Sequence, residues 1–321
     1  MTRSSTWRAL AVATLLTVLC SSAAWAQYKG DRIPGNVGLE VGTQAPPGIY
    51  TGYAVWFYPT DTLKDQNGDR VGTGDADLRS VLHGPVIAWV TPYVVAGGHV
   101  GASAMLPFIR NRLQANVLDV DTGLDLTDSI LTPINIGWHR TRADFLAAYN
   151  LYLPSGEFEP GGRDNSGLGM VGQEVSFGST AYFDQERLWH AAANLAYEWH
   201  TKKKDLDLRV GQIVTIEGGF GKAFHKNVGN GVPLITNVGV VGYGQFKVTE
   251  DSGSDIPLLL RDVGKDRVYG LGGEVNVYIP QVRVTLVGRV IPEFGARLRT
   301  QGTTFSFSAV YVARSLAAAT P

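Results

Sequence analysis

The chain has 321 residues, with 28 Lys and Arg against 29 Asp and Glu, and a formal net charge of −1 at pH 7. This balance excludes a protein that binds nucleic acid through a strongly basic surface. The 39 glycines exceed the usual share, and each Gly inside a helix costs roughly 1 kcal/mol, so a mainly helical protein is disfavoured. A content of 44% hydrophobic and 10% aromatic residues excludes a disordered chain. The composition favours an all-β protein.

The first 26 residues have the features of a secretory signal peptide. Arg3 and Arg8 give a positive start, residues 9–20 are almost all apolar, and Ala24 and Ala26 occupy the two positions that a signal peptidase reads. The apolar run is shorter than the roughly 20 residues that a membrane-spanning helix needs. We therefore predict that residues 1–26 are cleaved, with a buried helix as the alternative. Cleavage would remove the only cysteine of the chain and leave 26 basic against 29 acidic residues, a net charge of −3.

No later stretch contains about 20 consecutive apolar residues, which excludes a bundle of transmembrane helices. An exported chain of this kind can cross a membrane only as a closed β-barrel, where every backbone group in the lipid is hydrogen-bonded. The clearest strand is 188–201, in which apolar odd positions alternate with mostly polar even positions. Its apolar face begins and ends in Trp, at a spacing that matches the apolar band of an outer-membrane barrel, about 25 Å tall. We predict that Trp189, Tyr197 and Trp199 face the lipid.

Similar alternation recurs along the chain and predicts an antiparallel barrel of about twelve strands, an even number as in bacterial barrels. The predicted strands are 50–58, 81–90, 93–108, 130–139, 142–153, 168–184, 188–201, 206–223, 234–248, 267–279, 282–293 and 303–313. Long polar links alternate with short ones, which places both termini in the periplasm and the long links outside the cell. Two links break this alternation, because 202–205 is short and 224–233 is long. The barrel is predicted over 50–313, followed by a tail, 314–321.

The polar faces of these strands are predicted to line the lumen. The inward candidates carry both signs of charge, so we expect no ring of a single sign that would select ions. They are Glu174, His190, Asn194, Glu198, Arg209, Glu217, Glu274, Asn276, Arg283 and Arg289. A twelve-strand barrel encloses less space than an open porin, and residues 27–49, rich in Gly and Pro, are a candidate plug or periplasmic tether. The candidates for holding a hydrophobic ligand are aromatic residues whose facing the strand pattern leaves open, such as Tyr53, Phe57, Trp89, Tyr93, Trp138 and Tyr278.

No motif points to catalysis, and we expect no enzyme activity, no metal site and no cofactor. The chain has no Gly-x-Ser-x-Gly nucleophile elbow. His190 and His200 share a polar strand face with Glu198, which suggests either a metal or proton-transfer pair or polar lumen lining. Lining is favoured, because two histidines ten residues apart are roughly 33 Å apart along a strand and cannot share one metal ion. The lysines at 202–204 either contact lipopolysaccharide phosphates or form an ordinary solvated turn.

Five segments carry a resemblance to a known family. They read GNVG at 35–38, APPGIY at 45–50, YLPSGEFEPG at 152–161, LITNVG at 234–239 and GYGQFKVT at 242–249. These segments are similar to the family named for the putative MetA pathway of phenol degradation, which includes SphA-like outer-membrane proteins. The resemblance implies a bacterial outer-membrane barrel that carries hydrophobic or aromatic compounds, and it supplies no catalytic or ligand-binding residues. The chain departs from most such barrels because residues 312–321 follow the last aromatic residue.

Three functions stay open from the sequence. The favoured one is a passive outer-membrane channel for small hydrophobic, above all aromatic, molecules, surrounded by lipid and lipopolysaccharide and with no nucleic-acid partner. The second is a structural or adhesive barrel with a filled lumen, whose extracellular loops carry the binding surface. The third is a lipid-modifying outer-membrane enzyme, which requires a compact cluster of Ser, His and an acid near a membrane rim.

Overall fold

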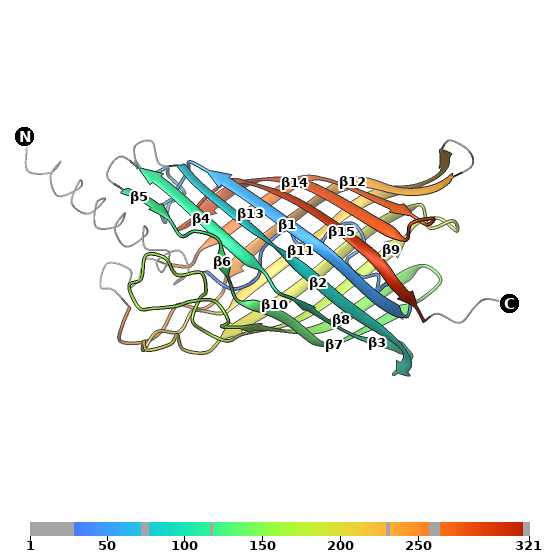
Figure 1. Cartoon of the computed structure of the whole chain (residues 1–321). Helices are drawn as coiled ribbons and strands as arrows, with labels where there is room; N and C mark the ends of the chain where they lie inside the picture. The colour runs from blue at the N-terminus through green and yellow to red at the C-terminus, as the bar shows by residue number, and fades with distance from the viewer. Residues whose placement is uncertain (1–28, 72–76, 116–117, 229–231, 257–263, 317–321) are drawn as a thin grey trace, which may run out of the picture.

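Twelve antiparallel strands close into a barrel in the computed structural model of this chain, which describes residues 29–71, 77–115, 118–228, 232–256 and 264–316 (Figure 1). The wall strands are β1 (Gly48–Thr60), β2 (Asp77–Val95), β3 (Gly98–Met105), β7 (Ser129–His139), β8 (Ala143–Leu153), β9 (Gly172–Tyr182), β10 (Trp189–His200), β11 (Ile213–Val228), β12 (Val232–Lys247), β13 (Arg267–Ile279), β14 (Val284–Arg297) and β15 (Thr303–Ser315). Strand β1 pairs with both β2 and β15, which closes the barrel. No helix among the described residues is long and apolar enough to cross a membrane. The predicted all-β barrel is confirmed.

Three short strands extend the wall at the end that carries the long links. Strand β4 (Phe108–Ala115) continues the line of β3 along β2, and β5 (Leu118–Asp121) and β6 (Asp125–Leu126) pair with β4. The sequence prediction ended a strand at residue 108 and missed this extension. The reason is local, because Pro107 has no backbone N–H and interrupts the strand between β3 and β4.

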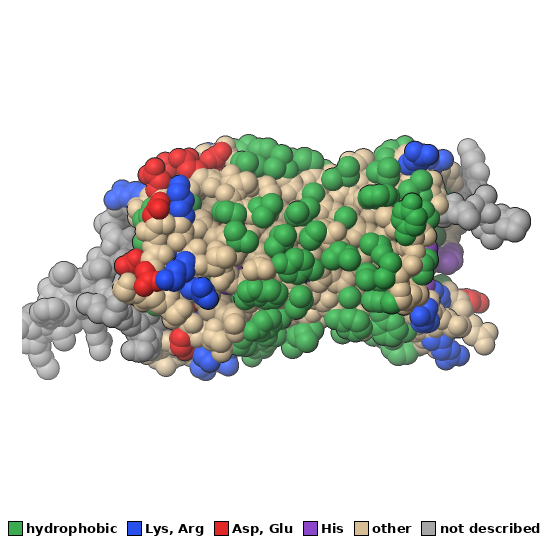
Figure 2. All heavy atoms as spheres, turned by 90° about the horizontal axis from the view of Figure 1, so that it is seen from below, with side chains coloured by type: hydrophobic (Ala, Val, Ile, Leu, Met, Phe, Trp, Pro, Cys, Tyr) green, Lys and Arg blue, Asp and Glu red, His purple; other side chains and the backbone are tan. Residues whose placement is uncertain are grey.

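Strand alternation decides which side chains face outward. In β10 the odd positions are exposed or half-buried and the even positions are buried. Trp189 is 42% exposed and Tyr197 is 36% exposed, while Trp199 is half-buried on the same outer face. Large apolar side chains of the other strands are also exposed and form a broad band along the barrel, with charged residues gathered towards the two ends (Figure 2). Such a band matches the hydrocarbon layer of a membrane.

The links alternate more regularly than the sequence suggested. Short links at 96–97, 140–142, 183–188 and 280–283 lie at one end, here called the short-turn end, and long links lie at the other, the long-loop end (Figure 1). Both links that appeared to break the rule obey it, since β10 ends at His200, β11 runs from Ile213 to Val228, and β12 begins at Val232. The prediction for 202–205 and 224–233 is therefore wrong.

The error has a packing cause. Leu206, Leu208 and Val210 alternate as in a strand, but they belong to the long loop between β10 and β11. Leu208 and Val210 form a small buried apolar cluster with Met170 of the neighbouring loop, and Leu206 packs against it. The alternation of apolar and polar residues in this loop therefore arises because its apolar side chains pack in a core between loops, outside the membrane-spanning wall.

The predicted chain ends are only partly described. The predicted signal peptide, 1–26, lies outside the described residues, as does 317–321 of the predicted tail. The first wall strand begins at Gly48 and the last ends at Ser315, each within two residues of the predicted barrel limits.

Candidate functional site

The inside of the barrel is occupied by residues 29–47, here called the lumen segment, which run from the long-loop end towards the short-turn end (Figure 1). Near the short turns, the amide of Gln44 donates a hydrogen bond of 2.6 Å to Asn135. Near the long loops, the backbone N–H of Asp31 donates to the carboxylate of Glu198 at 2.5 Å. The lumen segment therefore contacts the wall along most of the length of the barrel.

Glycine lets this segment approach the wall closely. A Cβ atom on Gly42 would lie 2.3 Å from the backbone carbon of Ser179 in β9. Because backbone atoms cannot move aside without breaking the sheet, only Gly fits at this position. The N–H of Gly42 donates to the hydroxyl of Thr180 at 3.0 Å, which fixes the contact.

Arg32 is the main ionic anchor of the lumen segment. One guanidinium nitrogen donates to Glu174 of β9 at 2.7 Å, and the other forms an ion pair with Glu217 of β11. The side chain of Arg32 is 5% exposed and both carboxylates are fully buried. Glu217 also accepts a hydrogen bond from the N–H of Gly35 at 2.6 Å. Buried charges are tolerated only when they are paired and hydrogen-bonded, so these contacts depend on one another.

A second polar contact lies further towards the short turns. Arg289 of β14 pairs with Glu274 of β13, and it also donates to the backbone carbonyl of Asn36 at 2.9 Å. The carboxylate of Glu40 accepts from Asn237 at 3.0 Å and from Asn276 at 3.3 Å. Side chains of three successive wall strands therefore hold the middle of the lumen segment.

Between these polar contacts the lumen segment inserts one apolar side chain into the wall. Leu39 is fully buried and belongs to a cluster with Val241, Tyr243, Val268 and Ile291. Glycines at 219, 221 and 239 leave the space that its methyl groups occupy, since a Cβ at any of them would lie within about 3.0 Å of Leu39. The contact therefore combines apolar burial with close packing.

Eight of the ten lumen candidates are on wall strands, with side chains that turn towards the inside of the barrel. They are Glu174, His190, Asn194, Glu198, Glu217, Glu274, Asn276 and Arg289. Arg209 and Arg283 are different, because both are exposed and lie in links. Arg209 is in the loop that precedes β11, and Arg283 is in the short turn before β14 with a positive φ of 55°. Placing these two arginines in the lumen is therefore wrong.

An apolar cavity of about 270 Å³ lies in the half of the barrel nearer the long loops. One side is formed by residues 29–34 of the lumen segment, and the other by β1, β2, β4 and β5. Its apolar lining includes Trp56, Leu82, Ile109 and Leu113. An apolar cavity of about 150 Å³ is large enough to bind benzene. The cavity of this barrel therefore has room for a substituted single aromatic ring.

The aromatic residues expected to hold a ligand are largely on the wrong face. Tyr53, Phe57, Trp89 and Tyr93 are exposed on the outer surface. Their strand neighbours Trp56 and Tyr58 line the cavity instead, as the alternation of side chains in β1 requires. Trp138 donates to the carbonyl of Ala96 at the short-turn end and Tyr278 is half-buried near that end, far along the strands from the cavity.

A polar wall closes one side of the cavity. The hydroxyl groups of Tyr58 and Tyr243 donate to the two oxygens of Glu293, at 2.5 and 2.7 Å. Arg299 donates to the side-chain oxygen of Gln245 at 2.8 Å and pairs with Asp266 at 3.3 Å. This wall offers a few oriented polar groups beside a mostly apolar lining, the usual composition of a small-molecule site.

The loops above the cavity have their own buried charges. Asp128 accepts hydrogen bonds from the N–H groups of Gly156 and Leu168, at 3.1 and 2.6 Å, while burial raises the pKa of its carboxyl. Lys203 donates to the carbonyl of Leu168 at 2.5 Å, and burial lowers the pKa of its ammonium to about 8. Lys203 is therefore packed inside the loop layer, whereas its neighbours Lys202 and Lys204 are exposed.

Sequence reasoning did not find Asp31, Arg32 or Leu39, although it marked their surroundings as a candidate plug. Their partners lie far along the chain, for example 142 residues away for the contact of Arg32 with Glu174. No local pattern distinguishes a lumen anchor from any other charged residue in a Gly-rich segment. The only sequence signal is that charged residues interrupt a segment without strand alternation.

The closed wall, the exposed apolar band and the buried polar interior define a bacterial outer-membrane β-barrel protein. Residues 60–309 match the family described as "Putative MetA-pathway of phenol degradation", so the chain belongs to this family. No curated protein matches the sequence.

Solved structures similar to this chain include other outer-membrane barrels. An outer membrane channel from Pseudomonas putida F1 is 13% identical with a TM-score of 0.67, and the match covers 88% of this chain and 99% of that one. The β domain of the Bordetella autotransporter BrkA is 11% identical with a TM-score of 0.48 and covers 83% and 99%. The CymD monoaromatic hydrocarbon channel is 11% identical with a TM-score of 0.43 and covers 94% and 99%. The Pseudomonas structure shares the fold of this chain.

Proposed function

We propose that the protein is a channel through which small hydrophobic compounds, aromatic ones in particular, diffuse passively across the outer membrane. The observation that carries this proposal is the apolar cavity of about 270 Å³ at the long-loop end, which faces the outside of the cell in the topology given by the short and long links. Membership of a family described by phenol degradation is consistent with an aromatic ligand.

In this proposal the cavity is a binding site on the way through the barrel. Trp56, Leu82 and Ile109 would hold an aromatic ring by apolar contact, while Tyr58 and Arg299 would orient a polar substituent. The lumen segment lies across the path below the cavity, so passage requires part of this segment to move. Transport then consists of binding, displacement of the segment and release, with no covalent step.

The surroundings of the barrel follow from the same topology. The apolar band would contact membrane lipid, and the exposed side chains of Lys202 and Lys204 at the long-loop end would contact lipopolysaccharide phosphates. Lys203, which is buried, would not take part.

A structural or adhesive barrel is the second candidate, and one observation favours it. Contacts of Arg32, Leu39 and Arg289 hold the lumen segment at several points, as expected for a lumen that stays filled. The two functions differ in whether the lumen segment ever leaves its place.

The test compares two variants on the same strand. Leu82→Trp fills the cavity, because Leu82 lines it, whereas Val81→Trp adds the same side chain at the neighbouring, outward-facing position. Cells that express each variant would be given a radiolabelled alkyl-phenol at low concentration, and initial uptake would be compared with cells that lack the gene. Liposome swelling with small sugars would be measured in parallel on the purified proteins.

A selective channel predicts protein-dependent uptake of the aromatic compound, little swelling with sugars, and a fall in uptake of about tenfold or more for Leu82→Trp alone. Equal permeability to sugars would indicate a general porin. Uptake that does not depend on the protein, together with no swelling, would refute the channel and favour the structural barrel.

A further inference from the structure

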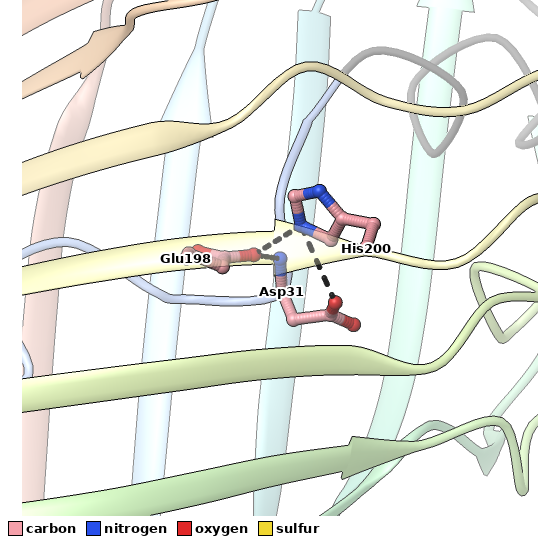
Figure 3. Close-up of side chains that lie close together, drawn as sticks. All are labelled: Asp31, Glu198 and His200. Carbon is pink, nitrogen blue, oxygen red and sulfur yellow. Dashed lines mark hydrogen bonds and ion pairs between the residues drawn. The ribbon is translucent and has the colours of Figure 1, made fainter.

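At the long-loop end of the lumen, one residue of the lumen segment meets two residues of the wall. Asp31, Glu198 and His200 each offer one ligand atom, and these three atoms lie within 4.8 Å of one another (Figure 3). Nε2 of His200 is 2.6 Å from the carboxylate of Glu198 and 3.8 Å from that of Asp31. All three side chains are at most 2% exposed.

The orientation of the imidazole leaves one nitrogen for a ligand. Nδ1 of His200 is 3.3 Å from the backbone carbonyl of Val210, which can only accept a hydrogen bond, so Nδ1 carries the proton. Nε2 then faces two carboxylates, and a metal ion lying between them would accept its lone pair. A histidine that donates one N–H to a backbone carbonyl and presents its other nitrogen is the usual arrangement of a metal ligand.

The carboxylate of Asp31 supplies an independent observation that points to a ligand. Its Oδ2 atom is buried and has no hydrogen-bond partner, and Figure 3 shows the carboxylate turned towards His200. Gly172 of β9 makes room for it, since a Cβ there would lie 2.0 Å from this oxygen. A buried carboxylate oxygen without a partner is costly unless a cation neutralises it.

The charges around the cluster leave a negative excess. Arg32, the nearest guanidinium, is already shared by Glu174 and Glu217. Asp128 and Lys203 also act on Asp31 and contribute one charge of each sign, so their effects oppose each other. Two carboxylates beside one imidazole therefore leave a negative charge, which a bound cation would balance.

We propose that Asp31, Glu198 and His200 bind a divalent transition-metal ion, with Zn²⁺ as the ion that best suits one imidazole and two carboxylates. Ligand atoms about 2.0–2.1 Å from a tetrahedral ion lie roughly 3.3 Å apart. The distances of 2.6 and 3.8 Å from Nε2 to the two carboxylates would each change by about 0.5–0.7 Å, which side-chain rotation can supply. Three protein ligands leave a fourth position for water. Ca²⁺ and Mg²⁺ prefer oxygen ligands alone and fit less well.

Such an ion would join two separate parts of the fold. Asp31 belongs to the lumen segment and lines the cavity, whereas Glu198 and His200 belong to β10. The metal would therefore fasten the part of the lumen segment around Asp31 to the barrel wall beside the cavity. This inference concerns metal binding alone and does not rest on the proposed transport function.

The test is a Zn²⁺ titration of the protein purified from outer membranes in detergent, after removal of bound metal with a chelator. Isothermal titration should give about one equivalent of Zn²⁺ for the unaltered protein. His200→Gln and Asp31→Asn should each weaken the affinity at least tenfold. His190→Gln is the matched control, because His190 is also buried on the inner face of β10 but lies ten residues away and outside the cluster. It should leave the affinity unchanged.

Co²⁺ provides a second readout, because a four-coordinate site with one nitrogen and two oxygen protein ligands absorbs visible light far more strongly than octahedral aqueous Co²⁺. The absorption should be present in the His190→Gln protein and absent from the His200→Gln protein. Asp31→Asn keeps the test meaningful if a wall variant fails to fold, since Asp31 is not part of a wall strand. Zn²⁺ binding that is absent from the unaltered protein, or that is as tight in the Asp31→Asn and His200→Gln proteins as in the unaltered protein, would overturn the proposal. Such a result would leave the uptake experiment unaffected.

Discussion

Removal of Arg32 should release the lumen segment from the wall. In Arg32→Met the apolar stem is kept, but Glu174 and Glu217 lose their shared cation while they are fully buried. Breaking a buried ion pair by removing one partner costs about 3–5 kcal/mol. Water can reach these carboxylates only if the lumen segment moves away. The substitution therefore destabilises the docked state of the segment relative to the undocked state. The population of undocked segment should therefore rise by roughly a hundredfold or more.

Thiol labelling can measure this change. Ala196 faces the lumen on β10 and is 1% exposed, so a cysteine placed there reacts with a bulky maleimide only when the lumen opens. The only cysteine of the natural chain is Cys20, which would be omitted by expressing the protein without residues 1–26. Labelling of Ala196→Cys should be roughly a hundredfold faster with Arg32→Met, as long as opening and closing are fast compared with the reaction.

Two controls make the result specific. Arg79→Met removes an exposed ion pair with Asp77 and should change the labelling rate by less than about twofold. Adding Glu217→Gln to Arg32→Met removes one of the unpaired carboxylates and should restore part of the protection. If Arg32→Met folds normally and labels at the unaltered rate, Arg32 does not hold the segment and the reasoning fails.

Three further predictions concern other parts of the molecule. Leu39→Ala should weaken docking of the segment by about 2–5 kcal/mol and accelerate the same labelling reaction, and an unchanged rate would contradict the role of this side chain. Leu195→Arg places a charge on the lipid face of β10 and should lower refolding stability in lipid vesicles by about 2–4 kcal/mol, measured by denaturant titration. A hydrogen bond and ion pair with Lys202 lower the pKa of Asp207 to about 2, so its contribution to loop structure is present above pH 4 and is lost as the pH falls towards 2. The rate at which pepsin cleaves the loop between β10 and β11 should therefore rise more from pH 4 to pH 2 in the unaltered protein than in Asp207→Asn, which reports the pH dependence of pepsin itself.

The sequence determined the wall of this protein by itself. A membrane-spanning strand has one face in lipid and one in a polar lumen, so the alternation in β10 identified Trp189, Tyr197 and Trp199 as outward residues and predicted twelve strands. In the loop before β11, alternation misled because another environment imitates it. Residues 206–210 alternate because they pack in a core between loops, and Arg209 was misplaced with them.

The interior was decided by the tertiary structure. Successive residues of a strand face opposite sides, so shifting the assignment of β1 by one residue exchanges Trp56 and Phe57 between the lumen and the lipid. The weak alternation in the sequence of β1 did not decide between the two assignments. Arg32, Leu39 and Asp31 acquire their surroundings from strands more than a hundred residues away. Local periodicity reports only whether a residue faces lipid or the lumen, whereas the partners inside the lumen depend on how the closed barrel brings distant strands around one short segment.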